Sequence, residues 1–345
     1  MSDALVSPAV GGALWAAAAG TCAVAARRVE RHGDERLVPL MGVLGAFVFA
    51  CQMVNFAIPG TGSSGHLGGG LLLSILLGPD AALLALTSVL LVQALFFADG
   101  GLLALGCNVV NLGLFTSYLA YPLVFRPIAG AAPSRRRLIA ACLAAGVVGL
   151  QLGAFGVVLE TWASGISSLP FRSFVMLMLP IHLAIGVVEG VATAAVVLVL
   201  RRAPPELAAC AAGGGPRSLR SLRPVVVGLA LAAVFTGGVG SWFASSRPDG
   251  LEWATAHAAQ GEVAAQGGLH DVLARAQRAV ALLPDYDFRA AAASEESAAP
   301  PRPAWPAPRV GTSVSGLLGA ALTLALVALA IGGLRLLRRK SRPTR

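Results

Sequence analysis

The scarce polar side chains within long apolar blocks are the residues that could do chemistry, because polar groups are costly inside a bilayer. His66 lies in the glycine-rich segment 60–70, at the outer mouth of a short apolar block. Imidazole, a free terminal amine and a deprotonated backbone amide are nitrogen ligands, and nitrogen-rich square-planar sites suit Ni²⁺ and Cu²⁺. His66 is therefore a candidate metal ligand. The alternative is a hydrogen-bonded structural histidine.

Other polar residues recur at helical spacing. His182 and Glu189 are seven residues apart, which places them on one helix face, and Asn108 and Asn111 are three apart. We expect them to form a polar network in a helix bundle or to line a substrate path. We expect Asn55, Gln52 and Asp99 to lie near the same outer level as His66. A membrane enzyme that uses His182, Glu189 and Asn111 is a competing hypothesis.

A further motif follows a late apolar block and reads Pro248, Asp249, Gly250, Leu251, Glu252. Pro-Asp-Gly is typical of a turn, here leading into a helix. Its carboxylates could attract cations but are too few for a dedicated cation cage. We expect His257 and His270, farther along, to be solvated surface residues.

Long apolar blocks must position all of these residues. The 345 residues are 56% hydrophobic and 12% charged, with mean hydropathy +0.74, whereas a soluble domain carries about 25% charged residues. A membrane-spanning helix needs about 20 apolar residues. Blocks of this kind run over 8–26, 37–58, 66–78, 80–97, 102–125, 138–159, 173–200, 223–243 and 312–334. The sequence predicts an all-α polytopic membrane protein: a bundle of about seven helices, one short, plus a two-helix unit with an extracytoplasmic loop.

The block 66–78 is too short to cross the membrane unaided, and Pro79 follows it. We interpret it as a half-span that other helices bury, since non-spanning backbone is tolerated at membrane depth when protein surrounds it. In other blocks, pairs of glycines recur at four-residue spacing, which lets helices approach closely. Ordinary packing within the chain explains these pairs, and a docking face for another membrane subunit is the alternative.

Basic clusters set the predicted orientation. The net charge is +9, but Arg and Lys gather in short segments between apolar blocks, which the positive-inside rule explains better than nucleic-acid binding does. These segments are 27–36, 126–137, 201–223 and 338–345. We therefore expect no nucleic acid as partner, a multi-pass protein in membrane lipid, an N-terminus outside and a cytoplasmic C-terminus.

A change in composition divides the chain. The segment 203–222 is rich in Ala, Gly, Pro, Ser and Arg, and we interpret it as a cytoplasmic linker between the domains 1–202 and 223–345. The second domain contains an extracytoplasmic segment, 244–311, whose tail 289–309 we expect to be flexible. The only lysine is Lys340, so a P-loop, which needs a lysine on the phosphates, is excluded.

Several of these motifs together resemble a known family. The segments 54–60 and 64–67, the opening 3–8, the stretch 108–111 and the run 182–190 are similar to the substrate-capture subunit of energy-coupling-factor (ECF) cobalt and nickel transporters, the CbiM and NikM type. The motif 248–252 resembles the signature of the small PDGLE-type partner, the CbiN and NikN type, apparently fused here to the same chain. The resemblance covers about 1–200 and 223–337.

The resemblance implies a transporter subunit rather than an enzyme, in the bacterial inner membrane. It would have no prosthetic group and would capture Ni²⁺ or Co²⁺, with nickel slightly favoured, at its outer face. Its implied partners are a transmembrane coupling protein and two cytosolic ATPases that drive release inward. The implied ligands are the terminal amine, the backbone amide and imidazole of a second-position histidine, and the histidine that His66 matches.

The N-terminus departs from this pattern. The family opens with Met-His, whereas this chain opens Met1-Ser2-Asp3. In the family, the aspartate that Asp3 matches comes two residues later than it does in this chain. We expect the start codon to lie two codons upstream; an altered ligand set is the alternative. His66 is then the ligand to carry over, with the Met1 amine and Asp3 as conditional ones. A third hypothesis is a non-catalytic membrane scaffold whose segment 244–311 binds an external partner.

Overall fold

The computed structural model describes residues 1–32, 37–202, 219–258, 267–288 and 305–341, almost entirely as helices. Most of the linker 203–222 and of the tail 289–309 lies outside these residues. The first unit contains α1 (Pro8–His32), α2 (Leu37–Gln52), β1 (Phe56–Ala57), β2 (Ser64–Gly65), α3 (Gly70–Leu77), α4 (Pro79–Phe96), α5 (Leu105–Asn108), η2 (Val109–Phe125), α6 (Arg126–Ala129), α7 (Arg135–Ser164) and α8 (Phe171–Arg202). The second contains α10 (Leu219–Gly238), α11 (Gly250–Ala258), α12 (Leu269–Val280) and α14 (Val310–Ser341), and short 3₁₀ turns complete the chain.

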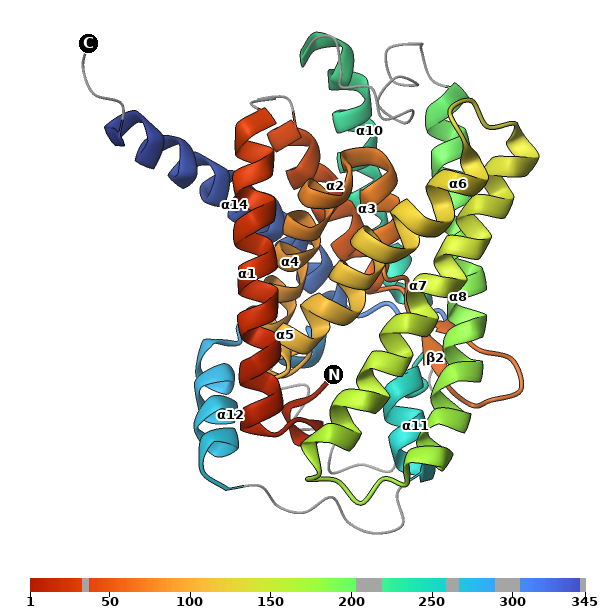
Figure 1. Cartoon of the computed structure of the whole chain (residues 1–345), viewed down its shortest axis with the longest axis vertical. Helices are drawn as coiled ribbons and strands as arrows, with labels where there is room; N and C mark the ends of the chain where they lie inside the picture. The colour runs from red at the N-terminus through yellow and green to blue at the C-terminus, as the bar shows by residue number, and fades with distance from the viewer. Residues whose placement is uncertain (33–36, 203–218, 259–266, 289–304, 342–345) are drawn as a thin grey trace.

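These helices confirm the predicted all-α membrane bundle. Six helices of the described part are long and apolar enough to cross a membrane, and two shorter apolar helices, Leu37–Gln52 and Arg223–Gly238, accompany them. α5, η2 and α6 form one continuous rod, so the described residues comprise seven rods in the first unit and two long ones in the second. In Figure 1 α1 runs roughly vertically from the lower end, whereas α14 runs obliquely and ends towards the upper left.

The short apolar block is a buried half-span, as its length predicts. All eight residues of α3 are buried, and Gly69 before it has φ +74°, a left-handed conformation that favours glycine. A β-carbon on Gly70 would lie 2.8 Å from the carbonyl oxygen of Leu112, so α3 packs directly against η2. This close packing places the segment before α3, which carries His66, inside the bundle.

Glycines allow α7 and α8 to pack in close contact. A β-carbon on Gly186 would lie 2.8 Å from the Cα of Val147, and one on Gly190 would lie 2.6 Å from the Cα of Leu143. The two backbones therefore touch without intervening side chains, as small residues allow in lipid. The glycines of α8 thus serve packing within the chain. They also set how closely α8, which carries His182 and Glu189, approaches α7.

The two-helix unit packs against the first unit through α2 and α4. α14 lies against α2 closely enough that a β-carbon on Gly319 would overlap the ring of Phe49. α10 and α14 meet at Gly237 and Gly316, where a β-carbon on Gly237 would lie 3.0 Å from the carbonyl carbon of Gly316. The second unit is therefore seated on the first as part of one helical body.

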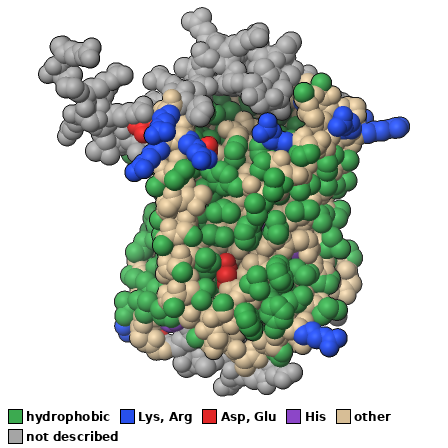
Figure 2. Space-filling view, in the orientation of Figure 1, with side chains coloured by type: hydrophobic (Ala, Val, Ile, Leu, Met, Phe, Trp, Pro, Cys, Tyr) green, Lys and Arg blue, Asp and Glu red, His purple; other side chains and the backbone are tan. Residues whose placement is uncertain are grey.

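The surface is that of a membrane protein. Figure 2 shows hydrophobic side chains over the middle of the molecule and Lys and Arg side chains gathered mainly towards its upper end. Large apolar residues such as Leu123, Met176 and Val199 are exposed, which a lipid environment accommodates.

Candidate functional site

The N-terminal segment is held against the loop that precedes α5. The Met1 amine donates a hydrogen bond to Oδ1 of Asn108 (3.0 Å), and the Met1 carbonyl accepts one from the Gly101 amide (3.0 Å). The carboxylate of Asp3 accepts a hydrogen bond from the Ala104 amide (2.9 Å). Asp3 thus anchors the terminus, and Asn108 orients the amine.

His66 directly follows a small hairpin. β1 and β2 pair antiparallel, with Phe56 opposite Gly65. The second unit extends this pairing: the Ser64 amide donates to the Pro248 carbonyl (2.8 Å), and the Ser64 hydroxyl donates to the Arg247 carbonyl (2.8 Å). The amide and the hydroxyl of Ser64 therefore fasten the strand that leads into His66 to main-chain carbonyls at the start of the Pro-Asp-Gly-Leu-Glu motif.

That motif forms the predicted turn and helix start. α11 begins at Gly250, where the Glu252 amide donates to Oδ1 of Asp249 (2.7 Å) and the Asp249 amide donates to Oε2 of Glu252 (3.3 Å). This reciprocal pair is a capping box. Gly250 is buried, and a β-carbon there would lie 2.7 Å from Cγ2 of Ile181. The motif is thus pressed against α8 beside His182.

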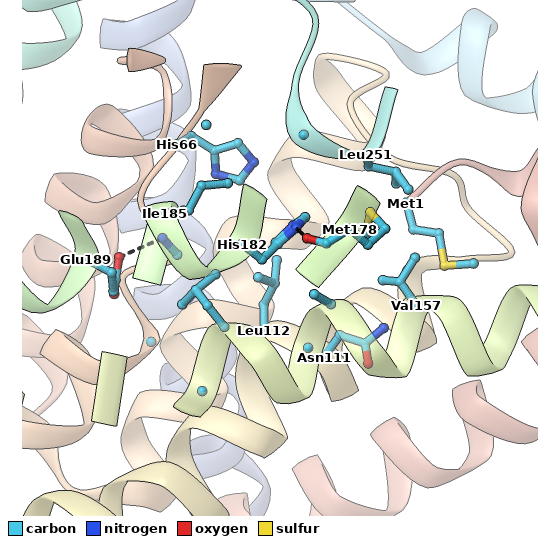
Figure 3. A pocket seen from close by; sticks show the side chains of 18 of the residues that line it. Met1, His66, Asn111, Leu112, Val157, Met178, His182, Ile185, Glu189 and Leu251 are labelled. Carbon is cyan, nitrogen blue, oxygen red and sulfur yellow. Dashed lines mark hydrogen bonds between the residues drawn. The ribbon is translucent and has the colours of Figure 1, made fainter. Parts of the chain in front are cut away.

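An inner cavity of about 110 Å³ lies where these elements meet. Its polar lining combines residues that the sequence analysis selected from separate segments: Met1, His66, Asn108, Asn111, His182, Glu189, Asp249 and Gly250. In Figure 3, Met1 and Glu189 lie at opposite ends of this group, with His182 between them. Leu112, Val157, Met178, Ile185 and Leu251 contribute apolar walls.

The polar groups deep in the cavity are engaged in hydrogen bonds with different partners. Nδ1 of His182 donates to the Met178 carbonyl (2.8 Å), and Nδ2 of Asn111 donates to Glu160 (2.8 Å). The Glu189 carboxylate accepts two backbone amides. His182, Glu189 and Asn111 do converge on one cavity, as the enzyme hypothesis requires, but they are not paired as an acid and a base.

A wider outer cavity, of about 540 Å³, adjoins the inner one and shares Met1, His66, Asn108, Leu112 and Asp249 with it. Its other polar residues include Asn55, Asp99, Glu252 and Asp285, together with one cationic residue, Arg247, so carboxylates outnumber positive side chains. Desolvation within the cavity, followed by the negative charge of Asp249, raises the pKa of Glu252, although its side chain reaches the surface. Desolvation and the charge of Asp99 likewise raise the pKa of Asp285. The carboxylates repel one another, so a cation in this space would relieve that repulsion.

Sequence reasoning missed some polar residues near the site. His270 is half-buried, and its Nε2 donates to the Val6 carbonyl (2.9 Å), so the expectation of a solvated residue is wrong for His270. His257 is exposed and stacks on Trp253, as expected for a surface residue. Gln52, which was expected near His66, is buried. Gln93 and Glu160, which were not selected, are buried too, and their polar character within apolar blocks is the signal that marks them.

Within the described residues, no group of three His, Cys, Asp or Glu side chains is arranged to hold a metal ion. A site built on His66 and main-chain nitrogens from the terminus needs no such group. An N-terminus far from His66 and the absence of a pocket beside it would favour the hypothesis of a non-catalytic scaffold. Met1 and His66 instead line the same cavities.

Comparison with known proteins identifies the family of the chain. The CbiM family profile, described as a cobalt uptake substrate-specific transmembrane region, matches residues 1–207. The chain belongs to the CbiM family. The PDGLE domain profile matches residues 223–337, so a CbiM-type region is fused here to a PDGLE-type partner, as the motifs predicted. The chain is a multi-pass membrane protein of a metal-transport family.

Individual relatives cover one or both parts of this CbiM-family chain. A fused nickel transport protein NikMN from Rhodobacter capsulatus is 33% identical and aligns over 98% of this chain and 99% of its own length. A cobalt transport protein CbiM from Geobacter sulfurreducens is 37% identical over 64% of this chain and 65% of its own length. A crystal structure of a truncated transition metal transporter is 29% identical, with a TM-score of 0.52, over 59% of this chain and 98% of that one.

Proposed function

We propose that this chain is the substrate-specific membrane component of an ECF-type importer for Ni²⁺ or Co²⁺. The observation that carries the proposal is the convergence of Met1 and His66, 65 positions apart in the sequence, on one cavity. The ion is the transported substrate and not a resident cofactor. Family membership and the nickel and cobalt relatives support this substrate class.

The cavities suggest a route for the ion. The outer cavity, with its carboxylates, would collect a hydrated dication, and the shared wall of Met1, His66 and Asn108 would receive it. His66 supplies an imidazole, and the terminus supplies an amine and a backbone amide. Nitrogen ligands in a planar arrangement suit nickel, and the full-length match to a fused nickel protein gives nickel a slight preference over cobalt.

The remaining parts of the proposal concern assembly. The end of the bundle that carries Met1 and the outer cavity faces outward, and the basic segments face the cytoplasm of a bacterial inner membrane. Residues 1–202 form the capture domain, 203–222 the linker and 223–345 the partner domain. A transmembrane coupling protein and two cytosolic ATPases supply the energy, since this chain lacks the lysine of a P-loop.

The test is metal uptake by cells that express the chain with coupling and ATPase subunits. His66→Ala should abolish accumulation of Ni²⁺ or Co²⁺, whereas His257→Ala, at an exposed histidine outside both cavities, should leave it unchanged. Each variant is made in two forms, one that begins Met1-Ser2-Asp3 and one with a Met-His extension before Met1. Undiminished uptake in both His66→Ala forms would refute the assignment of the site.

A further inference from the structure

Two consecutive backbone N–H groups, those of Gly68 and Gly69 shortly after His66, are held by one buried carboxyl group. Oε2 of Glu189 accepts a hydrogen bond from the Gly68 amide (2.9 Å), and Oε1 accepts one from the Gly69 amide (3.0 Å). Glu189 lies on α8 and is 2% exposed. Both oxygens of the Glu189 side chain therefore act as acceptors for consecutive backbone N–H groups.

The same segment is held from its other side by two glutamines. Nε2 of Gln52 on α2 donates to the Gly68 carbonyl (2.8 Å), and Nε2 of Gln93 on α4 donates to Oε1 of Gln52 (2.8 Å). Both glutamines are buried. Gly68, two residues after His66, is therefore held at its N–H by α8 and at its C=O by α2.

The backbone at this point has little freedom to adapt. Gly69 has φ +74°, and a β-carbon there would lie 2.4 Å from Cγ1 of Val48. Only glycine therefore fits at position 69, and the backbone there cannot move closer to Val48. Its position, and with it the direction in which the preceding His66 side chain leaves the backbone, depends on the groups that hold Gly68 and Gly69.

We propose that Glu189 is a positioning residue for ion capture, which acts with Gln52 and Gln93 by holding the Gly68 and Gly69 peptides so that His66 faces the cavity. This inference rests on the proposed function. A ligand that is held in place before the ion arrives loses less conformational entropy on binding. Residues that orient metal ligands typically contribute 10- to 100-fold to metal affinity.

The test measures Ni²⁺ and Co²⁺ affinity of the purified full chain, with the Met-His extension, by titration calorimetry. Glu189→Gln replaces one acceptor oxygen with a donor that opposes a backbone N–H, and it should weaken binding about 10- to 100-fold. Gln52→Met removes the hydrogen bond to Gly68 at similar volume and should weaken binding as well. Gln151→Met is the matched control, because Gln151 bonds to the Leu179 carbonyl between α7 and α8 and not to the glycine segment.

A double variant separates positioning from general damage. Glu189 and Gln52 hold the same peptide, so the combined loss in Glu189→Gln with Gln52→Met should be smaller than the product of the two single losses. The ligand-field spectrum of bound Co²⁺ should also change in each single variant, since His66 is then held differently. Glu189→Asp, one methylene shorter, should retain an intermediate affinity.

The outcomes are distinguishable. If the unaltered chain binds neither ion, the proposed function fails. If it binds and the two single variants bind with the same affinity and Co²⁺ spectrum, the positioning role fails alone. The positioning role would also be overturned if the affinity losses of Glu189→Gln and Gln52→Met multiplied in the double variant, or if Gln151→Met lost as much affinity as they do. Should Glu189→Gln not fold, as judged by its melting without metal, the affinity and spectrum of Gln52→Met decide the result.

Discussion

Gly250→Ala tests how the partner domain is seated on the capture domain. The added methyl would lie 2.7 Å from Cγ2 of Ile181 and 3.4 Å from Cε1 of His182, whereas carbon atoms pack favourably at about 3.5–4.0 Å. Ile181 is 2% exposed, and a β-branched side chain within a helix has one preferred rotamer, so it has little room to move. The methyl must therefore push α11 away from α8.

Such overpacking costs about 1–3 kcal/mol, and the better helix propensity of alanine returns at most about 1 kcal/mol. We expect a net destabilisation of about 1–2 kcal/mol and a melting temperature lower by a few degrees, measured on the detergent-solubilised chain. The displaced motif also opens the cavity wall beside His182, so metal affinity should fall.

Gly12→Ala in α1 is the control, because a β-carbon there meets nothing within 4 Å. Helix propensity alone should leave its melting temperature unchanged or slightly raised. If Gly250→Ala melts at the same temperature as Gly12→Ala and binds metal equally well, the tight seating of the motif against α8 is refuted.

Three further predictions follow from local geometry. Gly69→Ala combines a left-handed φ with a 2.4 Å approach to Val48, so it should lower both melting temperature and metal affinity, and unchanged values would contradict the tight fit before α3. Asp249→Ala removes the N-cap of α11 and should cost about 0.5–2 kcal/mol in thermal unfolding, with Asp249→Asn restoring most of it. Glu252 has a raised pKa, so its charged form destabilises the folded chain above that pKa. Glu252→Gln should therefore raise the melting temperature at pH 7. This gain should shrink as the pH falls through the pKa of Glu252, because the carboxyl group of the unaltered chain is then neutral as well. A gain that does not depend on pH would contradict this cause.

Much of the architecture was predictable because lipid imposes a strong constraint on sequence. The length of each apolar block identified the seven rods and two long helices, and the short block 66–78 was correctly interpreted as buried, although α3 itself is only Gly70–Leu77. Pro-Asp-Gly predicted the turn before α11 because the capping chemistry is local.

The site was predictable only as separate pieces. Helical spacing placed His182 and Glu189 on one face, but spacing says nothing about partners on other helices. The bonds from Glu189 to Gly68 and Gly69, and from Gln52 to Gly68, depend on how α2, α3 and α8 pack together. His270 was misjudged for the same reason: its partner, the Val6 carbonyl, is 264 positions away.

The most direct test of the central claim is the metal content of the purified chain at saturation, compared between the unaltered protein and His66→Ala, each with and without the Met-His extension. The account predicts about one Ni²⁺ or Co²⁺ per extended chain, and loss of that ion when His66 is replaced. Equal metal content in the unaltered and His66→Ala proteins would contradict it.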